Sequence, residues 1–207
     1  NVYTGSALTP QVTVKDGETV IPTSEYTVRY DDNTNAGTAT VTLVDKTGGN
    51  YAVSGRKTFE IAKAAQTLTA DDITATYGDT GVSAALSSSA FGAVRYAAAT
   101  EADAQIVAVD AESGALTFLK SGTARVTITA AGDGNHEPGS VTIYVTVAKR
   151  AISITVKDAE MRSGRPMPAF EAVYGNFAAG ESAETVFENP AVLTTEASGG
   201  KLGSFPI

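Results

Sequence analysis

The 207-residue chain contains no cysteine and no tryptophan, and it has a single histidine, His136. Without cysteine it can form neither a disulfide nor a thiolate metal site, and one histidine cannot make a multi-histidine metal site. No apolar run approaches the roughly 18 residues that a membrane-spanning helix needs, and the N-terminus lacks the pattern of a secretion signal. These absences predict a chain with no resident cofactor or metal and no membrane insertion.

Positive charge is also scarce. The sequence has 15 Lys and Arg against 23 Asp and Glu, which gives a net charge of -8. A surface with this charge repels phosphate backbones, so nucleic acid is not an expected partner.

What the sequence does contain is typical of strands joined by turns. Hydrophobic residues make up 43% of the chain, enough to bury a core, and 20 glycines interrupt it at short intervals. Its apolar residues are mostly small or β-branched, and threonine is abundant. The composition therefore predicts an all-β protein.

The sequence repeats itself. AKAAQTLT at 62–69 aligns with AKRAISIT at 148–155, a spacing of 86 residues from Ala62 to Ala148. Just upstream, GTATVTL at 37–43 aligns with GTARVTI at 122–128, and GNY at 49–51 aligns with GNH at 134–136. Repeats of this length indicate tandem modules that end in the same way.

Apolar and polar residues alternate within these segments. One strand face is expected to carry Tyr26, Val28 and Tyr30, a second Ala39, Val41 and Leu43, and a third Val141, Ile143, Val145 and Val147. A period of two predicts half-buried strands, and short strands separated by Gly, Asn and Asp turns favour immunoglobulin-like sandwiches.

Three groups of motifs resemble the bacterial Ig-like repeats of Gram-positive surface proteins. The first is YTG at 3–5, YTVRY at 26–30, NAGTA at 35–39, GNY at 49–51 and FEIAK at 59–63. The second, TYGD at 76–79, IVAVD at 106–110 and GTA at 122–124, mixes the MBG type of that superfamily with its group-2 type. The third is of the MBG type, with YGNF at 174–177, GE at 180–181 and GSFPI at 203–207, but MRSG at 161–164 stands where Tyr-Gly-Asp is expected. The resemblance implies an extracellular or bacterial cell-surface location and stalk-like roles, and it supplies no catalytic residues.

Together these observations predict an elongated, all-β chain of tandem immunoglobulin-like sandwich modules at 1–64, 65–149 and 150–207. The expected function is a non-catalytic spacer or adhesive stalk segment of a bacterial cell-surface or secreted protein. The alternative is a module that binds carbohydrate or a host protein. The expected partners are the neighbouring modules of the same chain, with a glycan or host protein as a further possibility.

The single histidine would have to serve any Ser-His-Asp triad. His136 follows a Gly-Asn turn, at the position that Tyr51 holds in the first module. This place favours packing beside a turn over general-base catalysis.

One segment partly fits a calcium loop. Asp31, Asn33 and Asn35 match its first three ligand positions, but Ala36 replaces the glycine at the sixth and Thr42 the glutamate at the twelfth. We expect turn-capping roles here and no metal.

The other acidic groups, Asp71 with Asp72 and the 110–112 stretch, are expected to be solvated and not paired for glycoside hydrolysis. Tyr51, Tyr96 and Phe177 lie near expected loops or strand ends, where a role in the core or at an edge is favoured over a sugar platform.

Three cations, Lys157, Arg162 and Arg165, gather at the start of the third module, where a solvated face is the expected arrangement. Lysine, asparagine and acidic residues are all present, as an intramolecular isopeptide bond requires, but no spacing identifies a set.

The repeat alignment also predicts incomplete terminal modules. When Gly5 is aligned with Gly78, the second module has the segment 65–76 before its Tyr-Gly motif, whereas the first has only Asn1 and Val2. The third module lacks the Ala-Lys ending of the other two. We therefore expect a missing first strand in the first module, a missing last strand in the third, and lowest stability in the third.

Overall fold

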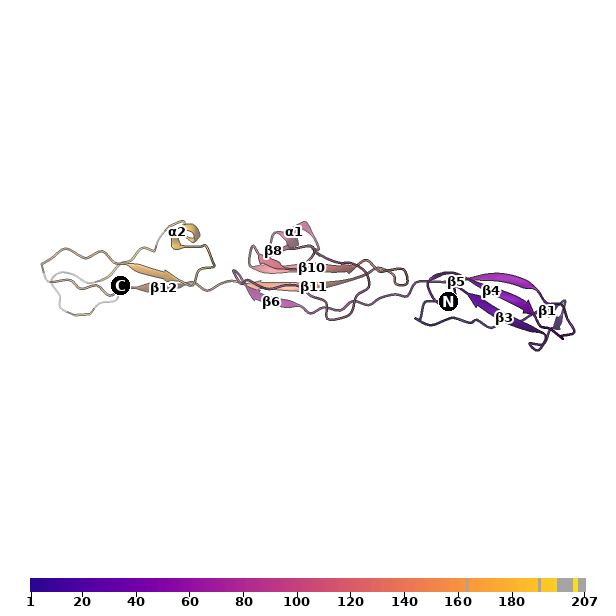
Figure 1. Cartoon of the computed structure of the whole chain (residues 1–207). Coiled ribbons are helices and arrows are strands. Elements are labelled where there is room, and N and C mark those ends of the chain that lie inside the picture. Colours follow the sequence, from indigo (N-terminus) through magenta and orange to yellow (C-terminus); the bar gives the residue numbers. More distant parts are fainter. Residues whose placement is uncertain (163, 190, 197–202, 205–207) are drawn as a thin grey trace.

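The computed structural model describes residues 1–162, 164–189, 191–196 and 203–204. Three β-rich parts follow one another along an elongated chain: an N-terminal part with strands between residues 15 and 61, a central part with strands between 73 and 148, and a C-terminal part with strands between 153 and 175 (Figure 1). The predicted fold class, all-β with tandem immunoglobulin-like sandwiches in an elongated array, is confirmed.

The N-terminal part contains an antiparallel three-stranded sheet in the order β3-β4-β5 and a small hairpin, β1-β2. The hairpin strands are Lys15–Asp16 (β1) and Thr19–Val20 (β2), and the sheet strands are Tyr26–Asp31 (β3), Gly37–Asp45 (β4) and Gly55–Ile61 (β5). The core between them is small. Its buried cluster is Ile21, Tyr26 and Val53.

The central part is a complete sandwich. One sheet has the order β6-β11-β10-β7, and the facing sheet is β8-β9, extended by the bridge between Ser83 and Ala115. The strands are Ile73–Thr76 (β6), Val94–Ala98 (β7), Val107–Val109 (β8), Leu116–Phe118 (β9), Gly122–Ala130 (β10) and Gly139–Ala148 (β11), with one helical turn, Glu101–Ala104 (α1).

The predicted alternation is confirmed in this sandwich. Along β10 every second residue from Ala124 to Ala130 is buried, and along β11 the buried residues are Ile143, Val145 and Val147. These side chains meet Phe118 and Leu116 of the opposite sheet in a single core. Burial of so much branched apolar surface makes the central part the most strongly packed of the three.

Each of the first two parts pairs its first segment with its last strand in parallel. In the central part β6 runs parallel to β11, with Thr76 opposite Ala148. In the N-terminal part Val2 forms a parallel bridge to Ala62. Equivalent backbone hydrogen bonds follow, because Tyr3 N donates to Ala62 O as Tyr77 N donates to Ala148 O, both at 2.9 Å.

The C-terminal part is the least packed. Its described elements are the antiparallel pair Ser153–Val156 (β12) and Ala172–Gly175 (β13) and the helical turn Ala183–Val186 (α2). Among its described residues, Ala178 is the one buried hydrophobic residue, and Ile154 is 49% exposed. Ser163 of the MRSG motif and residues 205–207 of the GSFPI motif lie outside the described residues.

Both helices in the described ranges are four residues long, too short to cross a membrane.

Candidate functional site: the two junctions

The parts of the chain touch at two places, and several of the residues considered above meet there. Junction 1 is the contact between the N-terminal and central parts, and junction 2 is the contact between the central and C-terminal parts. In Figure 1 they are the two places where a single connecting segment of the chain joins neighbouring parts.

At junction 1 the linker is itself part of the next module. Ala64 forms a parallel bridge to His136. Its N–H donates to Asn135 O at 2.9 Å, and its carbonyl accepts from Glu137 N at 2.8 Å. Because both the N–H and the carbonyl of Ala64 are hydrogen-bonded to the central part, the linker backbone is held in one position at this residue.

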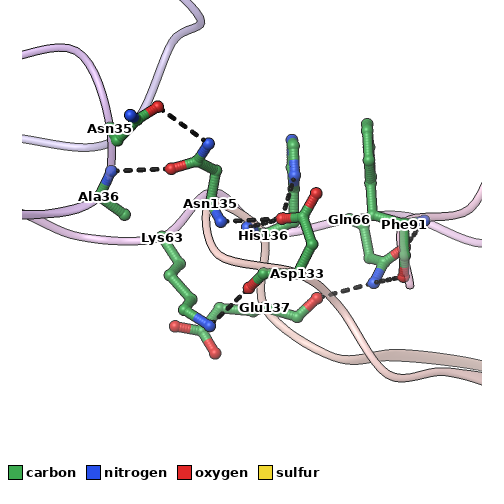
Figure 2. A network of polar contacts seen from close by, with 9 residues as sticks. All are labelled: Asn35, Ala36, Lys63, Gln66, Phe91, Asp133, Asn135, His136 and Glu137. Carbon is green, nitrogen blue, oxygen red and sulfur yellow. Dashed lines mark hydrogen bonds and ion pairs between the residues drawn. The ribbon is translucent and has the colours of Figure 1, made fainter. Parts of the chain in front are cut away.

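The Asn135 side chain crosses junction 1 in the opposite direction (Figure 2). Its Oδ1 accepts from Ala36 N at 2.9 Å, and its Nδ2 donates to Asn35 Oδ1 at 3.2 Å. Asn135 is partly buried. One amide group therefore satisfies a backbone donor and a side-chain acceptor of the preceding part.

Asp133 holds the turn that presents Asn135 (Figure 2). Its Oδ1 accepts from Asn135 N at 2.8 Å, from His136 N at 2.7 Å and from His136 Nδ1 at 2.8 Å. These donors, the Asn135 N–H foremost, hold the pKa of the Asp133 carboxyl below its usual range. The Lys63 ammonium also donates to Asp133 O at 2.6 Å, which adds a further contact from the linker.

Aromatic contacts complete junction 1. The His136 ring stacks on Phe91, with centroids 3.5 Å apart and planes at 4°, and Tyr3 meets it edge-on at 5.3 Å and 84°. The His136 side chain is only 15% exposed. Its predicted role in packing beside the turn is what the structure shows.

A glutamine beside the linker fixes Phe91. The Gln66 side chain accepts from Phe91 N at 3.0 Å and donates to Glu137 O at 2.8 Å. The residues that follow the linker therefore hold the aromatic stack in place (Figure 2).

Junction 2 uses charged side chains. The Arg150 guanidinium of the linker donates to Tyr77 O at 2.7 Å and to Asp79 Oδ1 at 3.1 Å. From the other side, the Tyr77 hydroxyl donates to Glu181 Oε1 at 2.8 Å. The carboxylate of Glu181, first through this hydrogen bond and then through its charge, raises the pKa of Tyr77.

Close backbone contact at junction 2 requires a glycine. Gly78 has φ +84°, and a Cβ at this position would lie 2.4 Å from the Cβ of Ala178. A cavity of about 260 Å³ remains beside this contact. Its lining residues are Tyr77, Ser121, Lys149, Arg150, Ile152, Phe177, Glu181 and Val186.

The residues that partly match a calcium loop have other partners. Asp31 pairs with Arg29 at 3.0 Å, and Asn33 Nδ2 donates to Leu8 O at 2.9 Å. Asn35 Oδ1 is the acceptor for Asn135 across junction 1. Within the described ranges no group of three or more His, Asp and Glu side chains could hold a metal ion.

The remaining acidic candidates cap backbone groups. Asp72 Oδ1 accepts from Tyr144 N at 2.7 Å. Asp110 Oδ1 accepts from the Ser113 hydroxyl at 2.6 Å and from the N–H groups of Ser113 and Glu112. The Ser113 hydroxyl foremost lowers the pKa of the Asp110 carboxyl.

The aromatic candidates are scattered. Tyr51 is 46% exposed at the outer end of the N-terminal part, whereas Tyr96 packs against the central core. Phe177 packs edge-on against Phe187 at 6.3 Å. The stack of Phe91 with His136 was not expected from the sequence.

The three cations of the C-terminal part do not act together. Lys157 pairs with Glu171 at 2.7 Å, and Arg162 contributes its carbonyl to a turn with Arg165 N.

Sequence reasoning missed Asn135, Asn35 and Glu181 as junction residues. The repeat alignment held a signal for the first, because the Gly-Asn turn at 134–136 recurs at 49–51.

Comparison with known proteins gives only distant similarity. No protein-family model and no curated protein matches the chain. An N-cadherin EC1-3 fragment from Drosophila is 15% identical with a TM-score of 0.32, covering 64% of this chain and 46% of its own, so the chain spans less than half of that fragment. Domains 4 and 5 of the S-layer protein SbsC are 15% identical with a TM-score of 0.30, covering 69% of this chain and 82% of their own. Human protocadherin-24 EC1-2 is 10% identical with a TM-score of 0.32, covering 64% and 71%. Similarity at this level does not assign the chain to a family.

Proposed function

We propose that this chain is a spacer or stalk segment of an extracellular or bacterial cell-surface protein, built from modules at 1–64, 65–149 and 150–207. The observation that carries the proposal is the backbone pairing of Ala64 with Asn135 and Glu137, which makes the linker a continuation of both modules. A spacer needs this property, because slack between modules would let the chain fold back on itself.

The side-chain contacts support the same function. At junction 1 the hydrogen bonds of Asn135 and Lys63 and the edge-on contact of Tyr3 with the His136 ring join the two parts in addition to the backbone pairing. Each hydrogen bond contributes only about 0.5–1.5 kcal/mol, but several acting together favour one orientation over the alternatives. The acidic surface and the resemblance to Gram-positive surface repeats are consistent with an exposed location.

Small-angle scattering on the full chain tests this function. Strands of this length at about 3.3 Å per residue give modules roughly 30–40 Å long, so three in line should approach about 100 Å. The matched variant carries a Gly-Gly-Ser insertion between Lys63 and Ala64, which separates the paired Ala64 from the end of the N-terminal part but leaves both cores intact. We expect the variant to have a shorter maximum dimension than the wild type, or a broader distribution of interatomic distances. A compact, near-spherical wild-type particle would contradict the proposal.

A second candidate function, binding of a glycan or host protein, is favoured by one observation. Phe91 is 40% exposed although its ring stacks on His136, so part of an aromatic surface faces solvent at junction 1. Aromatic faces of this kind can carry a sugar ring. A glycan array screened with the wild type and with Phe91→Ala tests it, and binding that persists in the variant would contradict this surface as the site.

A further inference from the structure

The four-stranded sheet of the central part has one face on the core and one face in solvent. Along β10 and β11 the residues that alternate with the buried ones point outward, because successive side chains of a strand lie on opposite faces. Around the middle of this outer face they are Thr123, Arg125 and Thr127 on β10 and Thr142, Tyr144 and Thr146 on β11. Tyr144 is the aromatic residue of this group, and it is 54% exposed.

Strand pairing fixes the neighbours of Tyr144. Arg125 lies directly opposite on β10, and the threonines two residues before and two residues after Tyr144 each pair with a threonine of β10. Directly opposite residues have Cβ atoms about 4.5–5.5 Å apart and diagonal neighbours lie about 7–8 Å apart, so hydroxyls and a guanidinium surround the ring. On the β6 side, Asp72 Oδ1 accepts from the Tyr144 N–H at 2.7 Å, which fixes the backbone at this position.

Arg125 is held in place by a buried carboxylate. Its Nη2 lies 3.3 Å from Asp103 Oδ2, and its backbone N–H donates to Asp103 Oδ1 at 2.9 Å. The Thr100 hydroxyl also donates to Asp103, at 2.6 Å, and this bond foremost lowers the pKa of the Asp103 carboxyl, which keeps it ionised. A guanidinium has five N–H donors, and the Arg125 side chain is 47% exposed. The carboxylate is therefore covered, whereas donors of a positioned cation remain for an acceptor outside the protein.

The repeat shows that the fold does not require this pair of side chains. In the N-terminal part the positions equivalent to Arg125 and Tyr144 are Thr40 and Thr58, which also lie directly opposite each other. The equivalent strands β4 and β5 thus pair in the same way with two threonines. A ring and a guanidinium at these positions in the central part therefore point to a role other than folding.

We propose that the surface centred on Tyr144 and Arg125 binds an acidic polysaccharide. One uronic acid ring stacks on Tyr144, and the carboxylate attached to that ring meets the Arg125 guanidinium on the neighbouring strand. The carboxylate lies toward β10, because Asp72 on the β6 side of the ring repels it. The threonine hydroxyls bond to sugar hydroxyls. This activity goes beyond a spacer, and it uses a different aromatic residue from the glycan surface considered above at Phe91.

The test titrates the full chain with an oligogalacturonate and with its methyl ester, which keeps the sugar rings and removes the charge. With the acid we expect saturable chemical-shift changes at the amides of Thr127, Thr142 and Tyr144, and the ester should bind about tenfold more weakly. Tyr144→Ala should weaken the binding of both ligands about tenfold, whereas Tyr144→Phe should retain it. Arg125→Gln should bind the acid no better than the ester.

Controls separate this surface from the rest of the chain. The melting temperature of each variant shows whether its fold is retained, and if Arg125→Gln does not fold, the comparison of acid with ester on the wild type still tests the cation. Phe91→Ala should bind as the wild type does. Absence of saturable shifts, equal affinity for acid and ester, or full affinity in folded Tyr144→Ala would overturn the proposal. Shifts confined to Phe91 and His136 would also overturn it, because they would place the glycan at junction 1. The spacer function is measured independently by scattering and stands or falls apart from these results.

Discussion

Junction 1 and junction 2 occupy equivalent positions in the repeat but are held by different chemistry. Tyr3 and Tyr77 sit at the same place in their modules, and each reaches into the next part of the chain. At junction 1 the Tyr3 ring meets His136, and a neutral asparagine enters the contact. At junction 2 the Tyr77 hydroxyl meets a carboxylate.

At junction 1 the Asn135 side chain fills the space beside Ala36. Ala36, which receives the Asn135 side chain, corresponds in the repeat to Ser121, and Ser121 lines the cavity of junction 2. At junction 1 an uncharged amide side chain therefore occupies this space, whereas among the described residues junction 2 is held by Arg150 and Glu181 beside a cavity. The backbone hydrogen bonds of Tyr3 and Tyr77 are equivalent, whereas the side-chain contacts differ, so the two junctions are expected to differ in stability through their side chains.

The largest difference is expected from alanine at the two equivalent glycines. Gly5 and Gly78 have φ +81° and +84°, so alanine costs about 1–2 kcal/mol of backbone strain at either position. Only at Gly78 does the new Cβ meet another part of the chain, at 2.4 Å from Ala178 Cβ. Overpacking there adds about 1–3 kcal/mol. Gly78→Ala should therefore lower the free energy of unfolding more than Gly5→Ala does, and it should loosen the contact between the central and C-terminal parts.

Urea unfolding measures the difference in free energy, and scattering measures the change in orientation. Equal losses in Gly5→Ala and Gly78→Ala would show that the contact of Gly78 with Ala178 contributes nothing.

A smaller effect is expected from Asn135→Ala. The variant removes two hydrogen bonds across junction 1 and leaves the partly buried Ala36 N–H unpaired, a loss of about 1–3 kcal/mol. Asn50→Ala is the matched control, because it lies in the equivalent turn at the outer end of the N-terminal part. The measurement is amide exchange at Ala36, which should accelerate in Asn135→Ala alone. Unchanged exchange would mean that water replaces the amide at no cost.

Acid should act on junction 1. The pKa of Asp133 is lower in the folded chain than in the unfolded one, so its contribution is present above the unfolded value of about 3.9 and is lost as the pH falls through the folded value. We expect the His136 and Phe91 amides to lose protection below about pH 4. Asp133→Asn, which cannot titrate, should show weaker protection at neutral pH and no such step, and a step that persists in this variant would assign the loss to another carboxylate.

Alkali should act on junction 2, with the smallest effect. The folded pKa of Tyr77 is raised, so its hydrogen bond to Glu181 contributes fully below the unfolded value of about 10 and is lost as the pH rises through the folded value. Ultraviolet titration should show one tyrosine ionising late, and Tyr77→Phe should abolish that step. Tyr3→Phe is the control at the equivalent position and should leave the step unchanged.

The fold was more predictable from the sequence than the junctions were. Alternating residues such as Ile143, Val145 and Val147 identify a strand face from local spacing alone, and the structure confirms it. The contact between Asn35 and Asn135 joins positions 100 residues apart, so no local pattern predicts it. The repeat indicated that both turns were equivalent but not which partner each would meet. The incomplete first and third modules remain predictions.

The parallel pairing of β6 with β11 determines how the central part responds when its ends are pulled apart. The chain enters this part at junction 1 and leaves it at junction 2, so tension draws β6 toward one end and β11 toward the other (Figure 1). The two strands must slide past each other, and the pairs from Ile73 to Thr76 share the load at once. An antiparallel terminal hairpin would instead open one bond at a time. Forced unfolding depends on the rate of this event, so the central part can resist stretching more strongly than its equilibrium stability alone would indicate.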